Sequence, residues 1–264
     1  MALSAHEIDY TIYGDDMQFV EIGLDPNEAI VSEAGAMMYM ESGIEMETQL
    51  GSGNESGFLG KLFSAGKRML TGESLFLTVF YNQSNKYARV ALAAPYPGKI
   101  IPLNLAEYGT MLCQKDSYLC SAKGTDIDIA FTKRFGAGLF GGEGFILQRL
   151  SGNGWAFAHA GGTVSEHELG PGEVLRVDTG CIVAFQERVD YDIQYVGKIK
   201  TALFGGEGLF FARLTGPGKV FLQSLPFSRL AGRIYKAAPQ TPGRGRGEGS
   251  ILGGIGNLLG GDRR

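Results

Sequence analysis

The sequence has few of the side chains that most often carry catalysis or bind metals. Its 264 residues include 3 histidines, 3 cysteines and 1 tryptophan. Cys113, Cys120 and Cys181 form no C-x-x-C pair, so their number and spacing fit neither a zinc knuckle nor a disulfide framework. We therefore expect reduced, mostly buried thiols in a reducing compartment.

Long apolar runs and an excess of basic charge are also missing. No stretch approaches the roughly 20 apolar residues that cross a bilayer, and residues 1–16 lack the basic and apolar regions of a signal peptide. The 24 basic and 28 acidic residues give a formal net charge of −4, whereas nucleic-acid binding relies on a basic surface. These features predict a cytoplasmic protein and argue against a nucleic-acid partner.

Glycine, by contrast, is abundant, and much of it belongs to an internal repeat. The sequence holds 41 glycines, about twice the roughly 7% share of an average protein. A Leu-Phe-Gly-Gly-Glu-Gly motif stands at 139–144 and again at 203–208, and an Arg-Leu pair follows each copy. The offset is 203 − 139 = 64 residues, and Asp126 and Asp190 correspond at the same offset. A whole unit is therefore repeated.

A third, more divergent copy lies upstream. Residues 24–30 match residues 169–175, and Glu45 occupies the place of Asp190. The connection that follows is longer in this copy, with 73 − 45 = 28 positions between its aligned acids against 207 − 190 = 17 in the last copy. We place the three repeats at about 19–93, 100–160 and 164–225.

Within each repeat, apolar and polar residues alternate as they do in strands with one solvated face. Tyr191 and Ile193, for example, alternate with Asp190 and Asp192. Helical periodicity is scarce, and only residues 60–70 resemble a short helix. The pattern predicts an all-β protein built from three double-layered, jelly-roll-like units related by pseudo-threefold symmetry.

The repeats are expected to pack into a single domain. Closure of the three units on one another would remove their exposed strand edges, so we expect one closed β domain over residues 1–239. Residues 240–264 are rich in glycine, with a few interspersed Ile and Leu residues. Such a composition buries little apolar surface, and we expect a flexible tail there.

The repeated glycine motif resembles that of a known family. The motifs at 139–144 and 203–208, the Arg-Leu pairs and the Gly-Leu-rich tail resemble the altered-inheritance-of-mitochondria, or mitochondrial biogenesis, family over essentially the whole chain. The resemblance implies a fold like that of the tryptophan RNA-binding attenuator protein, within the double-stranded β-helix class, and membership of an uncharacterised bacterial branch. Eukaryotic relatives are associated with mitochondrial inner-membrane organisation. This N-terminus lacks an Arg-rich presequence, which favours a prokaryotic cytoplasmic protein.

The residues that could carry chemistry have simpler structural interpretations. Cupin enzymes of this fold class bind a metal through a closely spaced His pair, which His159 and His167 do not form. Cys181 has no identifiable base and is interpreted as a core residue. The Gly-Gly-Glu-Gly loops lack the lysine and following helix of phosphate-binding loops. We therefore expect no enzymatic activity, no metal and no cofactor.

A set of charged residues follows the glycine motif. Glu143 and Arg149, like Glu207 and Arg213, share a strand face but lie 149 − 143 = 6 positions apart, too far for a direct pair along one strand. Each arginine is expected to reach a glutamate of a neighbouring strand or unit. The first repeat has Glu73 but a valine in place of the arginine. Structural ion pairing is favoured over a ligand site at these candidate axial charges.

Apolar residues cluster in the same connection of all three repeats, namely Leu59, Phe63, Phe135, Leu139, Phe140, Leu203 and Phe204. Pseudo-threefold symmetry would gather them at one end, either as a docking surface or as a plug of the barrel end. Our leading hypothesis is a non-enzymatic, homo-oligomeric scaffold that docks a protein partner or a peripheral membrane surface through that end. The alternative is a small-ligand-binding module with an axial pocket near Arg149 and Arg213, and RNA binding is less favoured.

Overall fold

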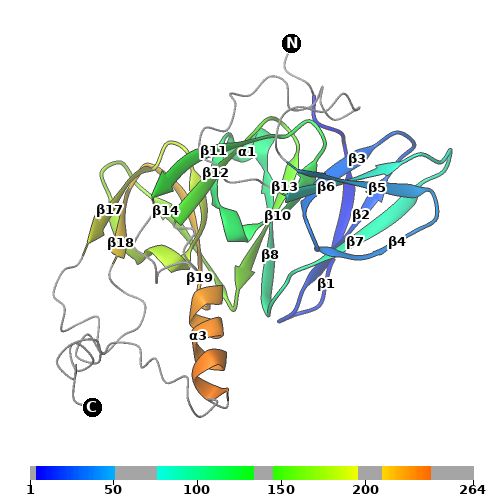
Figure 1. Ribbon diagram of the computed structural model, residues 1–264. Coiled ribbons are helices and arrows are strands. Elements are labelled where there is room, and N and C mark those ends of the chain that lie inside the picture. Colours follow the sequence, from blue (N-terminus) through cyan, green and yellow to red (C-terminus); the bar gives the residue numbers. More distant parts are fainter. Residues whose placement is uncertain (1–3, 51–75, 134–144, 196–209, 239–264) are drawn as a thin grey trace, which may run out of the picture.

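The computed structural model describes residues 4–50, 76–133, 145–195 and 210–238. Almost all regular structure in these residues is β, which confirms the predicted all-β class (Figure 1). Strand β1 (Asp9–Tyr13) precedes three successive sets of six strands. The first set is β2 (Phe19–Leu24), β3 (Ala29–Glu33), β4 (Met37–Met40), β5 (Ile44–Leu50), β6 (Phe76–Asn82) and β7 (Ala88–Ala93).

The second and third sets follow directly along the chain. The second is β8 (Gly98–Asn104), β9 (Met111–Gln114), β10 (Tyr118–Ala122), β11 (Asp126–Lys133), β12 (Phe145–Ser151) and β13 (Trp155–Gly161). The third is β14 (Val164–Leu169), β15 (Val174–Asp178), β16 (Ile182–Gln186), β17 (Asp190–Tyr195), β18 (Phe210–Thr215) and β19 (Gly218–Gln223). The α-helices among the described residues are α1 (Leu105–Tyr108) and α3 (Phe227–Ala237).

The three sets share one strand arrangement. In each set the first, sixth and third strands lie side by side, as do the fourth, fifth and second. A register shift also recurs in the third strand of every set, between Met37 and Tyr39, between Tyr118 and Cys120, and between Ile182 and Ala184. The set boundaries agree with the repeats read from the sequence. Their rotational superposition and the attenuator-like fold stay predictions.

A turn predicted to be equivalent in the first and third repeats has the same geometry in both. Asn27 and Gly172 both have left-handed φ angles, 72° and 76°, which asparagine and glycine tolerate better than other residues. The carboxylates of Glu28 and Glu173 each accept a backbone N–H from three residues earlier, at 2.8 Å. The sequence match between residues 24–30 and 169–175 therefore reflects a shared local structure.

The strands form four sheets stacked in a row, with a hydrophobic core in each of the three gaps (Figure 1). We call them the N-terminal outer sheet (β1-β2-β7-β4), the first inner sheet (β5-β6-β3-β10-β13-β8), the second inner sheet (β11-β12-β9-β16-β19-β14) and the C-terminal outer sheet (β15-β18-β17). Both faces of each inner sheet are covered, so every residue of β10 and β16 is buried.

Hydrogen-bonded strand pairs join one repeat to the next. β3 of the first repeat pairs with β10 of the second, and β9 of the second repeat pairs with β16 of the third. We call these two pairs the internal junctions. Each junction removes two strand edges from solvent. The same removal of exposed edges was the reason for expecting the three repeats to close on one another.

The stack does not close on itself through strand pairing. β4 and β15 are each the last strand of an outer sheet, and no pairing links them among the described strands. Figure 1 shows β4 and the β17–β18 pair at opposite ends of the row. The expectation of a closed body is therefore wrong for hydrogen-bonded closure, because the described strands form two junctions and β4 and β15 do not pair with each other.

Helix α3 is a further difference from the sequence-based expectation. It occupies residues 227–237, after the last repeat and within the residues assigned to the β domain. Its signal in the sequence is the helical spacing of Phe227, Leu230, Ala231 and Ile234, which spans only two turns. The helix expected at 60–70 and the tail at 240–264 lie outside the described residues.

Candidate functional site

The three histidines have separate structural environments. His6 accepts a backbone N–H through Nδ1 at 3.0 Å. His159 on β13 is buried against the ring of Tyr96, with ring centroids 4.4 Å apart, and burial lowers its pKa to about 4. His167 on β14 contacts the hydroxyl of Ser165 at 3.0 Å. Within the described residues, no three His, Cys, Asp or Glu side chains converge as metal ligands would.

The three cysteines are all free thiols. Cys113 and Cys120 are fully buried, and burial raises the pKa of both thiols well above the usual range. Such thiols stay protonated and are poor nucleophiles. Cys181 is half-buried, and its Sγ lies 3.8 Å from the guanidinium of Arg229. This contact links the third repeat to α3.

Arg149, one of the candidate axial charges, connects two repeats. It lies on β12, and its Nε donates to Oε1 of Glu187 at 2.8 Å. Glu187 follows β16, so the bond runs from the second repeat to the third. Both side chains are about half exposed, and a pair of that kind contributes roughly 0 to 1 kcal/mol. Arg149 thus has a partner in a neighbouring unit.

Arg213 lies elsewhere in the molecule. It alternates along β18 with Ala212 and Leu214, which are buried in the core below the C-terminal outer sheet, so Arg213 faces the outer surface. Arg149 alternates with Leu150, which is buried on the opposite side of its own sheet. The two arginines therefore do not share a pocket. Glu73, Glu143 and Glu207 lie outside the described residues.

The docking surface expected from the sequence also lies outside the described residues. Its members are Leu59, Phe63, Phe135, Leu139, Phe140, Leu203 and Phe204. Whether they form a surface or a plug stays a prediction. Two other features of the described residues can be examined as sites, namely a pocket beside β1 and the helix α3.

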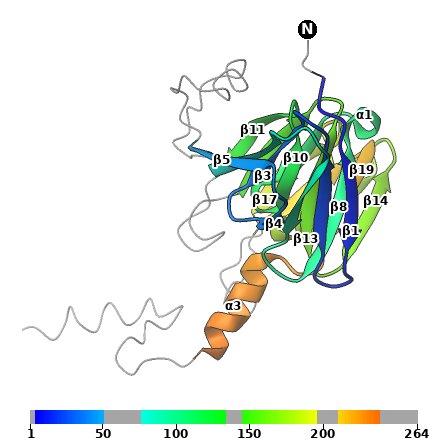
Figure 2. The same ribbon diagram turned by 90° about the vertical axis from the view of Figure 1, so that its right-hand side faces the viewer.

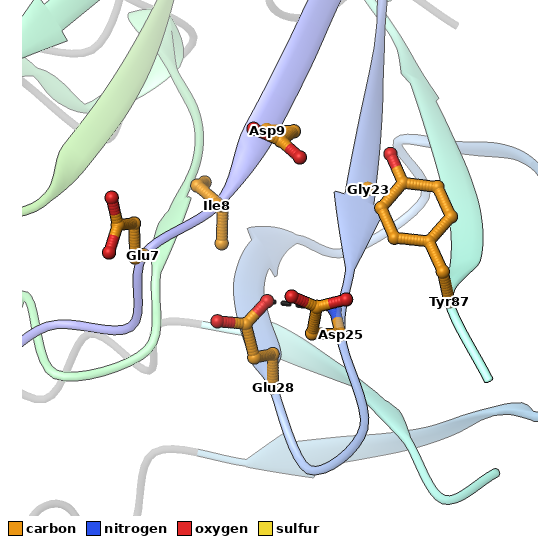
Figure 3. Close-up of a pocket in the computed structure, with 7 residues that line it drawn as sticks. All are labelled: Glu7, Ile8, Asp9, Gly23, Asp25, Glu28 and Tyr87. Carbon is orange, nitrogen blue, oxygen red and sulfur yellow. Dashed lines mark hydrogen bonds between the residues drawn. The ribbon is translucent and has the colours of Figure 1, made fainter. Parts of the chain in front are cut away.

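The pocket has a volume of about 260 Å³ and lies between β1, the end of β2 and the start of β7 (Figure 3). Figure 3 shows carboxylates around it, and its lining residues are Glu7, Ile8, Asp9, Gly23, Asp25, Glu28 and Tyr87. Glu28 accepts the backbone N–H of Asp25 at 2.8 Å. Burial raises the pKa of Glu28, and the neighbouring acids raise it further. Because Glu173 forms the same turn in the third repeat, we assign Glu28 a structural role.

Helix α3 is amphipathic. At 100° per residue, Phe227, Leu230 and Ile234 fall on one side, and Arg229 and Arg233 fall together on a separate side next to it. The helix sequence, FSRLAGRIYKA, contains three basic residues and no acid. A helix with this division is typical of elements that lie between an apolar phase and water.

The first turn of α3 is fixed to the body of the protein. The ring of Phe227 packs on Tyr96, with centroids 5.2 Å apart. The guanidinium of Arg229 lies 3.6 Å from a carboxylate oxygen of Asp178 and donates to the carbonyl of Ser224 at 3.3 Å. Figures 1 and 2 show the rest of the helix projecting away from the sheets. Its base is therefore held while its end extends outward.

The projecting half of α3 exposes large apolar side chains. Ile234 is 61% exposed and Tyr235 is 63% exposed. A helix of 11 residues is only about 16 Å long, and among the described residues no helix is both long and apolar enough to span a bilayer. The arrangement is suited to lying on a surface, with the apolar side inserted and the basic side in water.

Comparisons with known proteins agree with this fold. The family model described as mitochondrial biogenesis AIM24 matches residues 10–225. An uncharacterised protein of Streptococcus pyogenes serotype M6 is 30% identical over 227 residues, which are 84% of this chain and 88% of that protein. A crystal structure of a Streptococcus pyogenes protein, solved as a structural genomics target, has a TM-score of 0.69 at 24% identity and covers 88% of this chain and 100% of its own. The chain belongs to the mitochondrial biogenesis AIM24 family.

Proposed function

We propose that this protein is a non-enzymatic cytoplasmic scaffold that docks on an anionic membrane surface through α3. One observation carries the proposal: α3 projects from the third repeat with exposed apolar side chains and with only basic charges. The sequence-based hypothesis placed docking on the apolar loop residues, which lie outside the described residues. The present proposal places docking on α3 instead.

The two sides of α3 would contribute to binding in different ways. Inserting a side chain the size of Ile234 into the interface is favourable by about 1.5 to 3 kcal/mol. Each basic residue close to an anionic surface adds about 1 kcal/mol. Arg233 is exposed and makes no ion pair with the described acids. A single helix of this size gives weak and reversible binding, as a peripheral scaffold requires.

The environments of the reactive side chains support a non-enzymatic role. Burial keeps His159 neutral at physiological pH and keeps the thiols of Cys113 and Cys120 protonated. General acid–base catalysis needs a group whose pKa lies near the working pH and which can reach a substrate. Cys113 and Cys120 are instead packed in the cores between the sheets, and His159 is buried against Tyr96.

Vesicle cosedimentation tests the proposal. We expect binding to vesicles of phosphatidylcholine mixed with phosphatidylserine, weaker binding to phosphatidylcholine alone, and loss of the difference at high salt. Arg233→Glu should weaken binding to the anionic vesicles roughly tenfold or more, because one attraction is replaced by a repulsion. Ile234→Ser should weaken binding to both vesicle types, because it removes apolar contact.

Lys86→Glu is the matched control. Lys86 is exposed in the turn before β7, in the first repeat, and the substitution changes the net charge by the same amount as Arg233→Glu. We expect Lys86→Glu to bind like the unmodified protein. Equal binding by all variants, or no preference for anionic vesicles, would overturn the assignment of α3 as the docking surface.

A further inference from the structure

Strand β4 differs from its counterparts in the other repeats. All four of its residues are exposed, with Met37, Met38, Tyr39 and Met40 between 38% and 54% accessible. The counterparts β10 and β16 are buried along their whole length. β4 pairs with β7 on one side only, and an edge strand rich in large apolar side chains is a template for pairing with another chain. Methionine is suited to such contacts, because its flexible side chain adapts to a partner.

Strand β15 is the complementary strand. It corresponds to β3 and β9, which form the internal junctions with β10 and β16. In the C-terminal outer sheet, β15 pairs with β18 on one side only. One end of the stack therefore has an open edge on β4, the counterpart of β10 and β16. The other end has an open edge on β15, the counterpart of β3 and β9.

The backbones of both strands have hydrogen-bonding groups directed to the open edge. The N–H of Glu41 donates to the carbonyl of Arg89 at 2.9 Å, towards β7. Antiparallel strands direct alternate residues to opposite sides, so the N–H and C=O of Met40 point away from β7. On β15, the N–H of Gly216 donates to the carbonyl of Glu173 at 2.9 Å, and the same alternation directs the N–H and C=O of Arg176 away from β18.

The internal junctions define the register that these groups would adopt. Ser121 lies opposite Val31 in one junction, and Phe185 lies opposite Leu112 in the other. The register shift shared by β4, β10 and β16 makes Met40 the equivalent of Ser121 and Phe185. The repeat offset makes Arg176 the equivalent of Leu112, because 112 + 64 = 176.

A second hydrogen bond is common to both junctions. The N–H of Lys123 donates to the carbonyl of Ala29, and the N–H of Glu187 donates to the carbonyl of Thr110, both at 3.0 Å. At the two open strands the equivalent donor is the N–H of Ser42, and the equivalent acceptor is the carbonyl of Val174.

We propose that β4 of one copy of this chain pairs antiparallel with β15 of a second copy, with Met40 opposite Arg176 and Ser42 donating to Val174. This contact is a third junction of the kind that the chain already forms twice. It uses two different surfaces, so it joins copies head to tail and generates a closed ring or an open row.

Self-assembly of this kind is independent of membrane docking but would strengthen it. Each copy brings its own α3, and several linked helices bind a surface more tightly than one, without any new contact. Because assembly is measured in the absence of lipid, its failure and the failure of membrane docking are distinguishable.

Proline substitutions at the outward-facing positions test the proposal. Met40→Pro and Arg176→Pro each remove an N–H that the chain itself does not use, which an edge strand tolerates. The unmodified protein should form oligomers in light scattering after size-exclusion chromatography. Each variant alone should be a monomer. Mixed together, they should form a one-to-one dimer, because Met40→Pro retains β15 and Arg176→Pro retains β4.

Two controls keep the test decisive. Glu166→Pro places proline at an outward-facing position of β14, another exposed edge strand, and should leave assembly unchanged. If a proline variant fails to fold, Met38→Lys with Met40→Lys blocks the same edge by charge. A monomeric unmodified protein, oligomers that survive both blocks, or folded variants that do not complement each other would each overturn the proposal.

Discussion

The internal junctions and the two open strands occupy equivalent places in the repeats, yet their surroundings are opposite. β10 and β16 are buried among apolar neighbours on both faces, whereas β4 is exposed at every residue. The residue types also differ, since β10 reads Tyr-Leu-Cys-Ser-Ala whereas β4 consists of three methionines and a tyrosine. The burial of these equivalent strands therefore depends on whether a strand of a neighbouring repeat pairs with them.

The largest expected effect contrasts a buried junction residue with its exposed counterpart. Phe185→Ala removes a fully buried ring from β16 and should lower the free energy of unfolding by about 3 to 5 kcal/mol. Met40→Ala, at the equivalent position of β4, should change it by no more than about 0.5 kcal/mol when the protein is dilute. Urea denaturation of both variants measures this difference. Equal losses would show that β4 is covered within the chain itself.

Acid should weaken the inner sheets specifically. The pKa of His159 on β13 is lowered to about 4 from its usual 6.5 by burial, so the unfolded chain binds the proton more readily than the native state. The buried, neutral His159 therefore contributes roughly 3 kcal/mol to the free energy of unfolding above pH 6.5. This contribution is lost as the pH falls towards 4. His159→Leu should therefore flatten the fall in stability over this range. An unchanged pH profile in His159→Leu would contradict this account.

Two proline substitutions compare the backbone hydrogen bonds of an internal junction with those of an open strand. Ser121→Pro removes an N–H that faces β3 in an internal junction, and it leaves a buried carbonyl without its partner. This should cost about 1 to 3 kcal/mol of unfolding free energy. Met40→Pro at the equivalent open position should leave the dilute monomer nearly as stable as before. Thermal melts at low protein concentration compare the two, and a similar loss in both would mean that Met40 already donates within the chain.

The smallest effect is expected from the C-terminal tail. Residues 240–264 are rich in glycine, and their composition cannot offset the entropy of ordering them. A chain ending at residue 239 should melt within error of the full chain and should assemble to the same extent. A large drop in melting temperature would instead show that Ile251, Leu252 or the later leucines pack on the body.

The all-β class could be predicted because it depends on local patterns. Alternation of polar and apolar residues marked strands such as β17, and the matching turns at Asn27 and Gly172 repeat visible sequence. The open stack could not be predicted. The need to cover an exposed strand edge does not determine whether the covering strand comes from the same chain or from another copy.

The candidate site was harder to predict for two physical reasons. The apolar stripe of α3 covers only two turns, which is too short for periodicity to stand out from the surrounding glycine-rich sequence. The separation of Arg149 and Arg213 depends on which face of which sheet each one occupies, and a one-residue change of register reverses that face. Equivalent places in a repeat therefore do not imply a shared pocket.

Hydrogen exchange at different protein concentrations tests the pairing of β4 with β15 most directly. The amide N–H groups of Met40 and Arg176 should exchange rapidly in dilute protein and become protected as the concentration rises. Those of Ser121 and Leu112, which belong to the internal junctions, should be protected throughout. Rapid exchange of Met40 and Arg176 at every concentration would contradict the third junction, as would full protection of both in a dilute monomer.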